Sequence, residues 1–209
     1  QIDTDQEYTF AAAMRSLLRQ NPNIVMVGEI RDEETAKTAI EASLTGHLVL
    51  STIHTNSAAG AIPRFMGLGI DPQTLANSIE CSIGQRLVRK LCPDCKKETE
   101  LTPEIKKEVE EIIKTINLES GITIPKELKF YQAIGCEKCG NIGYKGRLGI
   151  YEIIVNSPDM QKLIQQPQIT NYEIEQQAIK NGSVLILQDG ILKALSGETS
   201  IEEVFRVAK

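Results

Sequence analysis

The chain has 209 residues, of which 41% are hydrophobic and 24% charged, and its formal net charge is −5. This composition indicates a folded globular protein of one domain with an appendage or of two small domains, and not a disordered chain. The acidic balance disfavours non-specific nucleic-acid binding. No apolar run approaches the roughly 18 residues of a membrane span, and the residues that follow Gln1 do not have a signal-peptide pattern.

The first third of the chain alternates predicted helices and strands. Residues 9–22 read as a helix, and an apolar strand is expected at Ile24–Val27. Asp32 is placed to cap a following helix that Gly46 terminates, and a second apolar strand is expected at Leu48–Ile53. Because both strands are continuously apolar, we expect an α/β fold whose sheet is covered on both faces.

The middle of the chain is predicted to be mainly helical. After a short helix near residues 57–69, Asp71-Pro72 begins a longer helix that runs into the first cysteine pair. Its inner face would carry Leu75, Ile79, Ile83, Leu87, Val88 and Leu91. A charged amphipathic helix is expected at 103–118, and residues 129–155 read as short strands joined by glycine turns.

The last part of the chain, from Ser157 onward, returns to short capped helices. There is no internal repeat and no low-complexity linker. The changes of pattern divide the chain into three expected parts, residues 1–91, 92–150 and 151–209. Because the sequence does not begin with Met and opens inside a pattern, we expect a fragment or a processed protein.

Four of the five cysteines form two C-x-x-C pairs, Cys92 with Cys95 and Cys136 with Cys139. Each pair suits a tight turn that points two sulfurs at one centre, and two such turns complete a tetrahedral structural zinc site. The alternatives are a redox motif, two disulfides or buried thiols, but redox motifs rarely come as two separated pairs and disulfides need export. Cys81, on the predicted long helix, is expected to be a small core residue.

Basic side chains surround the first cysteine pair, and they leave a second interpretation open. The cluster consists of Arg86, Arg89, Lys90, Lys96 and Lys97. It is typical of a non-enzymatic zinc module that binds a protein or nucleic acid, or simply of a solvated helix end, where positive charge is favoured. A zinc module alone would not need the α/β segment 9–56, which favours an enzyme.

Polar side chains follow the two predicted strands. Glu29 comes after the first strand, and His54 comes after the second, beside Thr52 and Thr55. Ligands gather at the carboxyl ends of strands in open α/β sheets, and these groups suit a γ-phosphate and its attacking water. A histidine that flanks a strand is nevertheless more often structural, and this alternative applies to His47 as well as to His54. The phosphate-loop pattern G-x-x-x-x-G-K-[ST] does not occur in the chain.

Taken together, these motifs resemble the secretion ATPase superfamily, the type II secretion and type IV pilus assembly ATPases, which are hexameric P-loop motors. "NPNIVMVGEIRDEETAKTAIEASLTGHLVLSTIHTNSA" is similar to the family's Walker B segment and histidine box. "QRLVRKLCPDC" and "CEKCGNIGYKGRLGIYEII" resemble its tetracysteine zinc subdomain, and "ILQDGILKALSGETSIEEVFRV" resembles its C-terminal helical signature.

The resemblance implies a fold and a set of site residues. It makes residues 1–91 the C-terminal part of a RecA-like P-loop ATPase core, 92–150 a tetracysteine zinc-binding subdomain and 151–209 a small helical subdomain. Glu29 would be the Walker B glutamate that positions magnesium and water, His54 the histidine nearest the γ-phosphate, and His47 its companion in nucleotide binding. The implied zinc ligands are Cys92, Cys95, Cys136 and Cys139.

The resemblance also implies cofactors and partners. The cofactors are a structural zinc ion and, in the intact parent protein, ATP and Mg²⁺. The phosphate loop would lie upstream of Gln1, so the chain alone is expected to be inactive. The parent would form a homohexamer that meets an inner-membrane platform protein and the secretion or pilus machinery. It would be cytoplasmic and peripheral to the inner membrane, without direct contact to nucleic acid.

Overall fold

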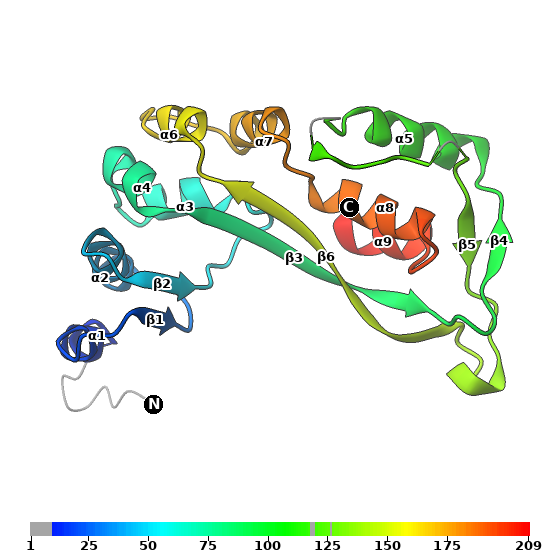
Figure 1. Ribbon diagram of the computed structural model, residues 1–209, viewed down its shortest axis with the longest axis horizontal. Coiled ribbons are helices and arrows are strands. Elements are labelled where there is room, and N and C mark those ends of the chain that lie inside the picture. The colour runs from blue at the N-terminus through cyan, green and yellow to red at the C-terminus, as the bar shows by residue number, and fades with distance from the viewer. Residues whose placement is uncertain (1–9, 118–119, 126) are drawn as a thin grey trace. The chain divides into compact units, whose positions relative to one another are not determined.

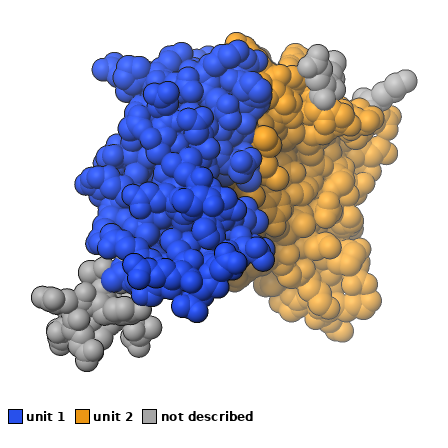
Figure 2. Space-filling model, turned by 60° about the vertical axis from the view of Figure 1, so that its left-hand side comes forward, with its two compact units in different colours: residues 1–82, 156–174 blue, residues 83–155, 175–209 orange. Residues whose placement is uncertain are grey.

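The computed structural model describes residues 10–117, 120–125 and 127–209 (Figure 1). The chain divides into two compact units (Figure 2). Unit 1 contains Gln1–Ser82 and Asn156–Ile174, and unit 2 contains Ile83–Val155 and Glu175–Lys209. The division into three parts stays a prediction. Among the described residues, no helix has both the length and the apolar character that crossing a membrane requires.

The helices and strands of the described residues follow in chain order. Within unit 1 lie α1 (Phe10–Leu18), β1 (Ile24–Val27), α2 (Glu33–Leu44), β2 (Leu48–Ser51), α3 (Ala61–Gly67), α4 (Pro72–Ser78) and α6 (Pro158–Ile164). Within unit 2 lie β4 (Lys97–Thr99), α5 (Pro103–Lys114), β5 (Phe130–Gln132), a 3₁₀ turn (Glu137–Cys139), β6 (Tyr144–Val155), α8 (Ile186–Leu195) and α9 (Ile201–Ala208). Strand β3 (Cys81–Leu91) and helix α7 (Asn171–Lys180) run from unit 1 into unit 2.

Unit 1 contains a two-stranded parallel sheet of β1 and β2, with Ile24 opposite Leu48 and Val27 opposite Ser51. The α/β expectation for this segment is confirmed. Asp32 caps α2 by accepting a hydrogen bond from the Thr35 N–H at 2.8 Å, as its position predicts. The expected helix at residues 9–22 is α1, although Thr9 lies outside the described residues.

Only one face of the β1–β2 sheet is covered within the described residues. Val25 and Val27 are buried on that face. On the other face Ile24, Met26, Leu48 and Leu50 are between 49% and 77% exposed. The expectation of a sheet covered on both faces is therefore wrong for the part of the chain that the structure describes.

The predicted long helix between Asp71 and the first cysteine pair is also wrong. Helix α4 ends at Ser78, and the backbone of Ile79 is extended, with φ −84° and ψ 129°. The next segment is β3, an eleven-residue strand. Cys81 lies on this strand and is exposed, so it is not the core residue that the sequence predicts.

Strand β3 owes its extended form to β6, with which it pairs (Figure 1). The two strands run in opposite directions, and the Gln85 Nε2 atom donates to the Tyr151 hydroxyl at 3.1 Å. Gly84 lies against Glu152, because a Cβ atom at that position would come within 2.7 Å of the Glu152 Cγ atom. Residues 129–155, expected as short strands, instead form the short β5 and the twelve-residue β6.

Three helices complete the core of unit 2. The buried side chains of this core come from α5, β5, α8 and α9 and are Val109, Ile113, Phe130, Ile191, Ala194, Leu195, Ile201 and Val204. Helix α8 also covers an edge of β6, because Asp189 accepts a hydrogen bond from the Tyr151 N–H and Lys193 donates one to the Gly149 carbonyl. Such side-chain partners protect backbone groups that would otherwise be unpaired.

The end of β3 is held by the segment that leads into α9. The Leu91 N–H donates to the Glu198 carbonyl at 2.8 Å, and the Thr199 hydroxyl donates to the Arg89 carbonyl at 2.8 Å. Glu203, on α9, accepts hydrogen bonds from the backbone and the side chain of Arg89. The residue that follows this fixed strand end is Cys92.

Candidate functional site

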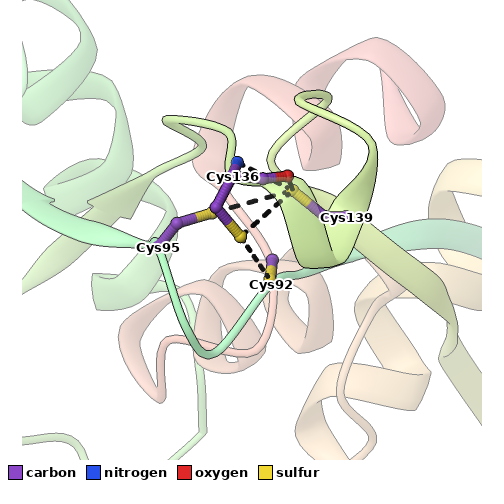
Figure 3. Close-up of side chains that lie close together, drawn as sticks. All are labelled: Cys92, Cys95, Cys136 and Cys139. Carbon is purple, nitrogen blue, oxygen red and sulfur yellow. Dashed lines mark hydrogen bonds between the residues drawn. The ribbon is translucent and has the colours of Figure 1, made fainter.

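Four cysteine thiols converge in unit 2 (Figure 3). Cys92 follows β3, Cys95 precedes β4, and Cys136 and Cys139 lie at the two ends of the 3₁₀ turn. All four Sγ atoms lie within 4.8 Å of one another, with distances of 3.9 Å for Cys92–Cys136, 3.9 Å for Cys95–Cys139 and 3.7 Å for Cys136–Cys139. Four sulfurs at 2.3 Å from a central zinc ion would be about 3.8 Å apart. The thiols therefore have the spacing of a tetrahedral metal site.

The two C-x-x-C segments fold into similar tight turns. In the first, the N–H groups of Cys95 and Lys96 donate to the Cys92 carbonyl. In the second, the Cys139 N–H donates to the Cys136 carbonyl at 3.1 Å, and Gly140 takes a left-handed conformation with φ 62°. Glycine reaches this conformation without the steric cost that a Cβ atom imposes. Each turn points its two sulfurs to the same side, so the backbone prepares the cluster.

The surroundings of the cluster shift the pKa values of two of its thiols in opposite directions. Burial raises the pKa of the Cys95 thiol to about 12. Burial acts on Cys139 in the same direction, but the N–H groups of Cys136 and Gly143 donate to its sulfur and lower its pKa to about 6. A bound dication would deprotonate all four thiols, since thiolates are the form that ligates metals.

An ion pair joins the two cysteine turns. Lys138, from the second turn, lies 2.5 Å from a carboxylate oxygen of Asp94, from the first. The lysine side chain is 68% exposed, so the pair contributes little to stability by itself. It does bring a positive charge close to a group of sulfurs that become thiolates when a metal binds.

A second cluster lies in unit 1, at the carboxyl ends of β1 and β2. The His54 Nε2 atom is 3.0 Å from the Glu29 Oε2 atom, although the residues are 25 positions apart in the sequence. The Thr52 hydroxyl donates to the Gly28 carbonyl at 2.7 Å and so holds the backbone just before Glu29. The structure thus brings together the carboxylate and the imidazole that the sequence indicates.

Arg31 is a member of this cluster that the sequence analysis missed. Its Nε atom is 2.6 Å from the same Glu29 Oε2 atom that His54 contacts. This hydrogen bond is the main reason why the pKa of Glu29 lies below its ordinary value; burial opposes the change and His54 adds to it. The available signal was an arginine two positions after the acidic residue, which sequence reasoning alone does not separate from an ordinary surface charge.

The structure does not bring His47 to this cluster. His47 precedes β2, whereas His54 follows it, so the two histidines lie at opposite ends of the strand. The His47 Nδ1 atom is 3.0 Å from the Ala42 carbonyl oxygen and 3.1 Å from the Thr45 hydroxyl, at the end of α2. These contacts fit a structural histidine, and nucleotide binding by His47 stays a prediction.

Two side chains of the basic cluster near the first cysteine pair make contacts within unit 2. Arg89 binds Glu203 at 2.7 Å and stacks over the Tyr144 ring, and Lys96 donates to the Gly197 carbonyl at 2.7 Å. Arg86, Arg89 and Lys90 lie on strand β3, so their interpretation as a solvated helix end is wrong.

Comparison with known proteins places the whole chain in one group. Residues 1–206 match the family model described as "Type II/IV secretion system protein". The chain is 45% identical over 210 residues to the type IV pilus assembly ATPase PilB of Pseudomonas aeruginosa, and the match covers all of this chain and 35% of that protein. It is 42% identical over 209 residues to the type II secretion system protein E of Aeromonas hydrophila, covering all of this chain and 39% of that protein. The chain therefore spans well under half the length of these relatives.

Solved structures with a similar fold include two ATPases. The Legionella pneumophila ATPase DotB matches with a TM-score of 0.61 and 21% identity, over 95% of this chain and 42% of that one. The pilus retraction motor PilT with bound ADP matches with a TM-score of 0.61 and 22% identity, over 96% of this chain and 43% of that one. At these identities the similarity establishes the fold alone.

Proposed function

Since the chain belongs to the Type II/IV secretion system protein family, we propose that it is the C-terminal portion of a hexameric ATPase that powers type IV pilus assembly or type II protein secretion. One observation carries the proposal. The hydrogen bond between Glu29 and His54 joins a carboxylate and an imidazole at the carboxyl edge of a parallel sheet, where α/β proteins place their ligands.

The residues of this cluster suit the hydrolysis of a phosphoanhydride bond in which water is the nucleophile and the diphosphate is the leaving group. The Glu29 carboxylate would orient the attacking water, and His54 would lie beside the terminal phosphate. When bound, ATP supplies the phosphoryl group and Mg²⁺ neutralises its charge. The Glu29 carboxylate would also help to bind the magnesium ion, because Mg²⁺ prefers oxygen ligands.

The chain carries only part of such a site. Its 209 residues contain no G-x-x-x-x-G-K-[ST] segment, whose backbone N–H groups and lysine provide most of the phosphate contacts in P-loop enzymes. The proposed activity therefore belongs to the full-length protein. We place that protein on the cytoplasmic side of the inner membrane, as a homohexamer that contacts an inner-membrane platform protein and does not bind nucleic acid directly.

The test is ATP turnover by the full-length protein and its Glu29→Gln variant. Because the glutamine keeps the volume of Glu29 and loses its charge, kcat should fall by about two orders of magnitude or more while ATP affinity stays within a few-fold. Glu34→Gln is the matched control, since Glu34 is an exposed glutamate of the same unit that pairs with Arg15. Absence of turnover in the full-length protein, or near-normal turnover in Glu29→Gln, would overturn the proposal.

The four-cysteine cluster is the second part of the proposal. We infer that Cys92, Cys95, Cys136 and Cys139 bind one structural zinc ion, because their sulfurs have tetrahedral spacing and leave no position for a further ligand. Metal analysis of protein purified without chelator should give about one zinc per chain. Zinc together with an inactive full-length protein would favour the non-enzymatic zinc module instead.

A further inference from the structure

We propose that Arg31 is a positioning residue, whose guanidinium holds one oxygen of the Glu29 carboxylate so that the other oxygen is presented to the attacking water. This inference rests on the proposed function of Glu29. It adds a residue that acts through Glu29 and does not itself touch the reacting atoms.

The geometry divides the two carboxylate oxygens of Glu29 into an anchored one and an open one. Oε2 is 2.6 Å from the Arg31 Nε atom and 3.0 Å from the His54 Nε2 atom. Within the described part of the chain, no hydrogen bond to Oε1 is formed. A carboxylate that is held twice through one oxygen cannot rotate freely, so the direction of the other oxygen is fixed.

The backbone around Arg31 is itself held on both sides. Ile30 is buried, and its N–H donates to the Thr52 carbonyl at 2.9 Å, which ties this turn to the end of β2. Asp32, on the other side, caps α2 through the Thr35 N–H. With its neighbours fixed, Arg31 needs to order only its side chain to reach Glu29.

The chemistry of the pair favours orientation over proton transfer. A guanidinium stays protonated at every working pH and offers donors in a rigid plane, so Arg31 supplies a constant charge and a constant direction. The pKa of Glu29 is lowered, mainly by this hydrogen bond, so the carboxylate stays ionised and is a weak base. A weak but well-directed acceptor suits the alignment of a water molecule.

The simpler interpretation is a surface ion pair without a role. The Arg31 side chain is 70% exposed and that of Glu29 is 36% exposed, and such pairs contribute little to stability. This exposure makes the two interpretations separable, because removing Arg31 should leave the fold intact. Any large effect on turnover would then come from the site and not from unfolding.

The first test uses the full-length protein with Arg31→Gln and Arg31→Lys. Loss of the anchor should lower kcat by about 10- to 100-fold while KM for ATP changes less than about threefold, because the interaction acts on the orientation of water and not on nucleotide binding. Lysine keeps the charge but not the planar donor, so Arg31→Lys should recover only part of the rate. The control is Arg15→Gln, which removes the same charge from the exposed Arg15–Glu34 pair of unit 1. A kcat within twofold of the parent in Arg31→Gln, or full recovery by lysine, would overturn the proposal.

The second test needs no turnover and uses the 209-residue chain. The Arg31 Nε–H signal in a ¹⁵N NMR spectrum should move and exchange faster with water in Glu29→Gln, and should not respond to Glu34→Gln. If the shift and the exchange rate of this signal are the same in Glu29→Gln as in the parent chain, the hydrogen bond between Arg31 and Glu29 is refuted, whatever the turnover measurements show. If the signal responds but Glu29→Gln leaves turnover unchanged in the full-length protein, then the pairing stands and the proposed function of Glu29 fails, together with the positioning role.

Discussion

The connection between α9 and β3 through Glu203 should be sensitive to acid. The Glu203 carboxylate has no exposed side-chain surface and accepts hydrogen bonds from two arginines. Oε1 is 3.0 Å from the Arg89 backbone nitrogen and 2.6 Å from Arg206 Nη2, and Oε2 is 2.7 Å from Arg89 Nη2 and 2.9 Å from Arg206 Nε. Burial alone would raise the pKa of this carboxyl, but the hydrogen bonds from Arg206 and Arg89 outweigh it and lower the pKa to about 2.

The lowered pKa gives both the sign and the size of the effect. The pKa of Glu203 is lower in the folded chain than the ordinary value of 4.5 that applies to the unfolded chain. The ionised form therefore stabilises the fold, fully above about pH 5, and this contribution is lost as the pH falls from about 4.5 towards 2. A difference of about 2.5 pKa units corresponds to about 3 kcal/mol, of which about 2 kcal/mol is lost by pH 3.

Urea unfolding at pH 7, 5, 4 and 3 would measure this contribution in the parent chain, Glu203→Gln and Glu202→Gln. Glu203→Gln should be less stable at pH 7 by about 3 kcal/mol, because two arginines lose their charged partner, and should lose less stability than the parent between pH 5 and 3. Glu202, an exposed neighbour on α9, provides the matched charge change. Acid also affects the thiol cluster, but equally in all three proteins. Parallel stability curves for the parent and Glu203→Gln between pH 5 and 3 would refute this reasoning.

Other predictions concern activity, metal and packing. In the full-length protein, His54→Ala should lower ATP turnover less than Glu29→Gln and should uncouple it from pilus extension or secretion; a His54→Ala variant less active than Glu29→Gln would contradict this. The 209-residue chain alone should not hydrolyse ATP, and Glu29-dependent turnover in a phosphate-release assay would show otherwise. Cys136→Ser should release the metal and increase hydrogen exchange across residues 92–150 but not in β1 and β2. Gly190→Ala should lower the free energy of unfolding by about 1–3 kcal/mol in urea titrations, because its Cβ would lie 2.5 Å from the Val204 Cγ1 atom.

The error at β3 shows what a periodic pattern can and cannot determine. Ile79, Ile83, Leu87 and Leu91 recur every four residues, which places them on one face of a helix. Four is also a multiple of two, so the same repeat is equally compatible with one face of a strand. In β3 that face is not the buried one predicted for the helix, because Ile83 is 60% and Leu87 49% exposed. The choice depends on β6, whose residues come more than fifty positions later, and no local pattern contains that pairing.

The prediction for β1 and β2 failed in a different way. The apolar character of Ile24, Met26, Leu48 and Leu50 is typical of a sheet covered on both faces, and this led to the expectation that the structure contradicts. Whether the second face is covered depends on its packing partners, and within the described residues these four side chains remain between 49% and 77% exposed. The secondary structure of this segment was therefore predictable, whereas the burial of its side chains was not.

The proximity of the candidate site residues was predictable to the extent that strand ends and short turns position them. Glu29 and His54 follow parallel strands, and parallel strands bring their carboxyl ends to the same edge, so sequence order alone implies that the two lie close. Each cysteine pair lies in a turn whose hydrogen bonds join residues only three to five positions apart, so the sequence of the turn is enough to predict its shape. Arg31 was missed because its contact depends on the direction of a long side chain within a turn, which neither periodicity nor spacing encodes.

The position of the cysteine cluster follows from the pairing of β3 with β6. Cys92 comes directly after β3, and Cys139 lies shortly before β6, so two antiparallel strands deliver one cysteine turn each to the same end of the ladder. The Cys92 N–H donates to the Gly143 carbonyl at 3.0 Å and continues the pairing up to the sulfurs. A metal bound there would join the two ends of the segment that connects β3 to β6 and contains α5. Metal loss should consequently open the β3–β6 ladder from the Leu91 end, while the Gly84–Glu152 contact persists. Hydrogen exchange after chelation would reveal this order, and faster exchange at Gly84 than at Cys92, whose N–H donates to the Gly143 carbonyl, would contradict it.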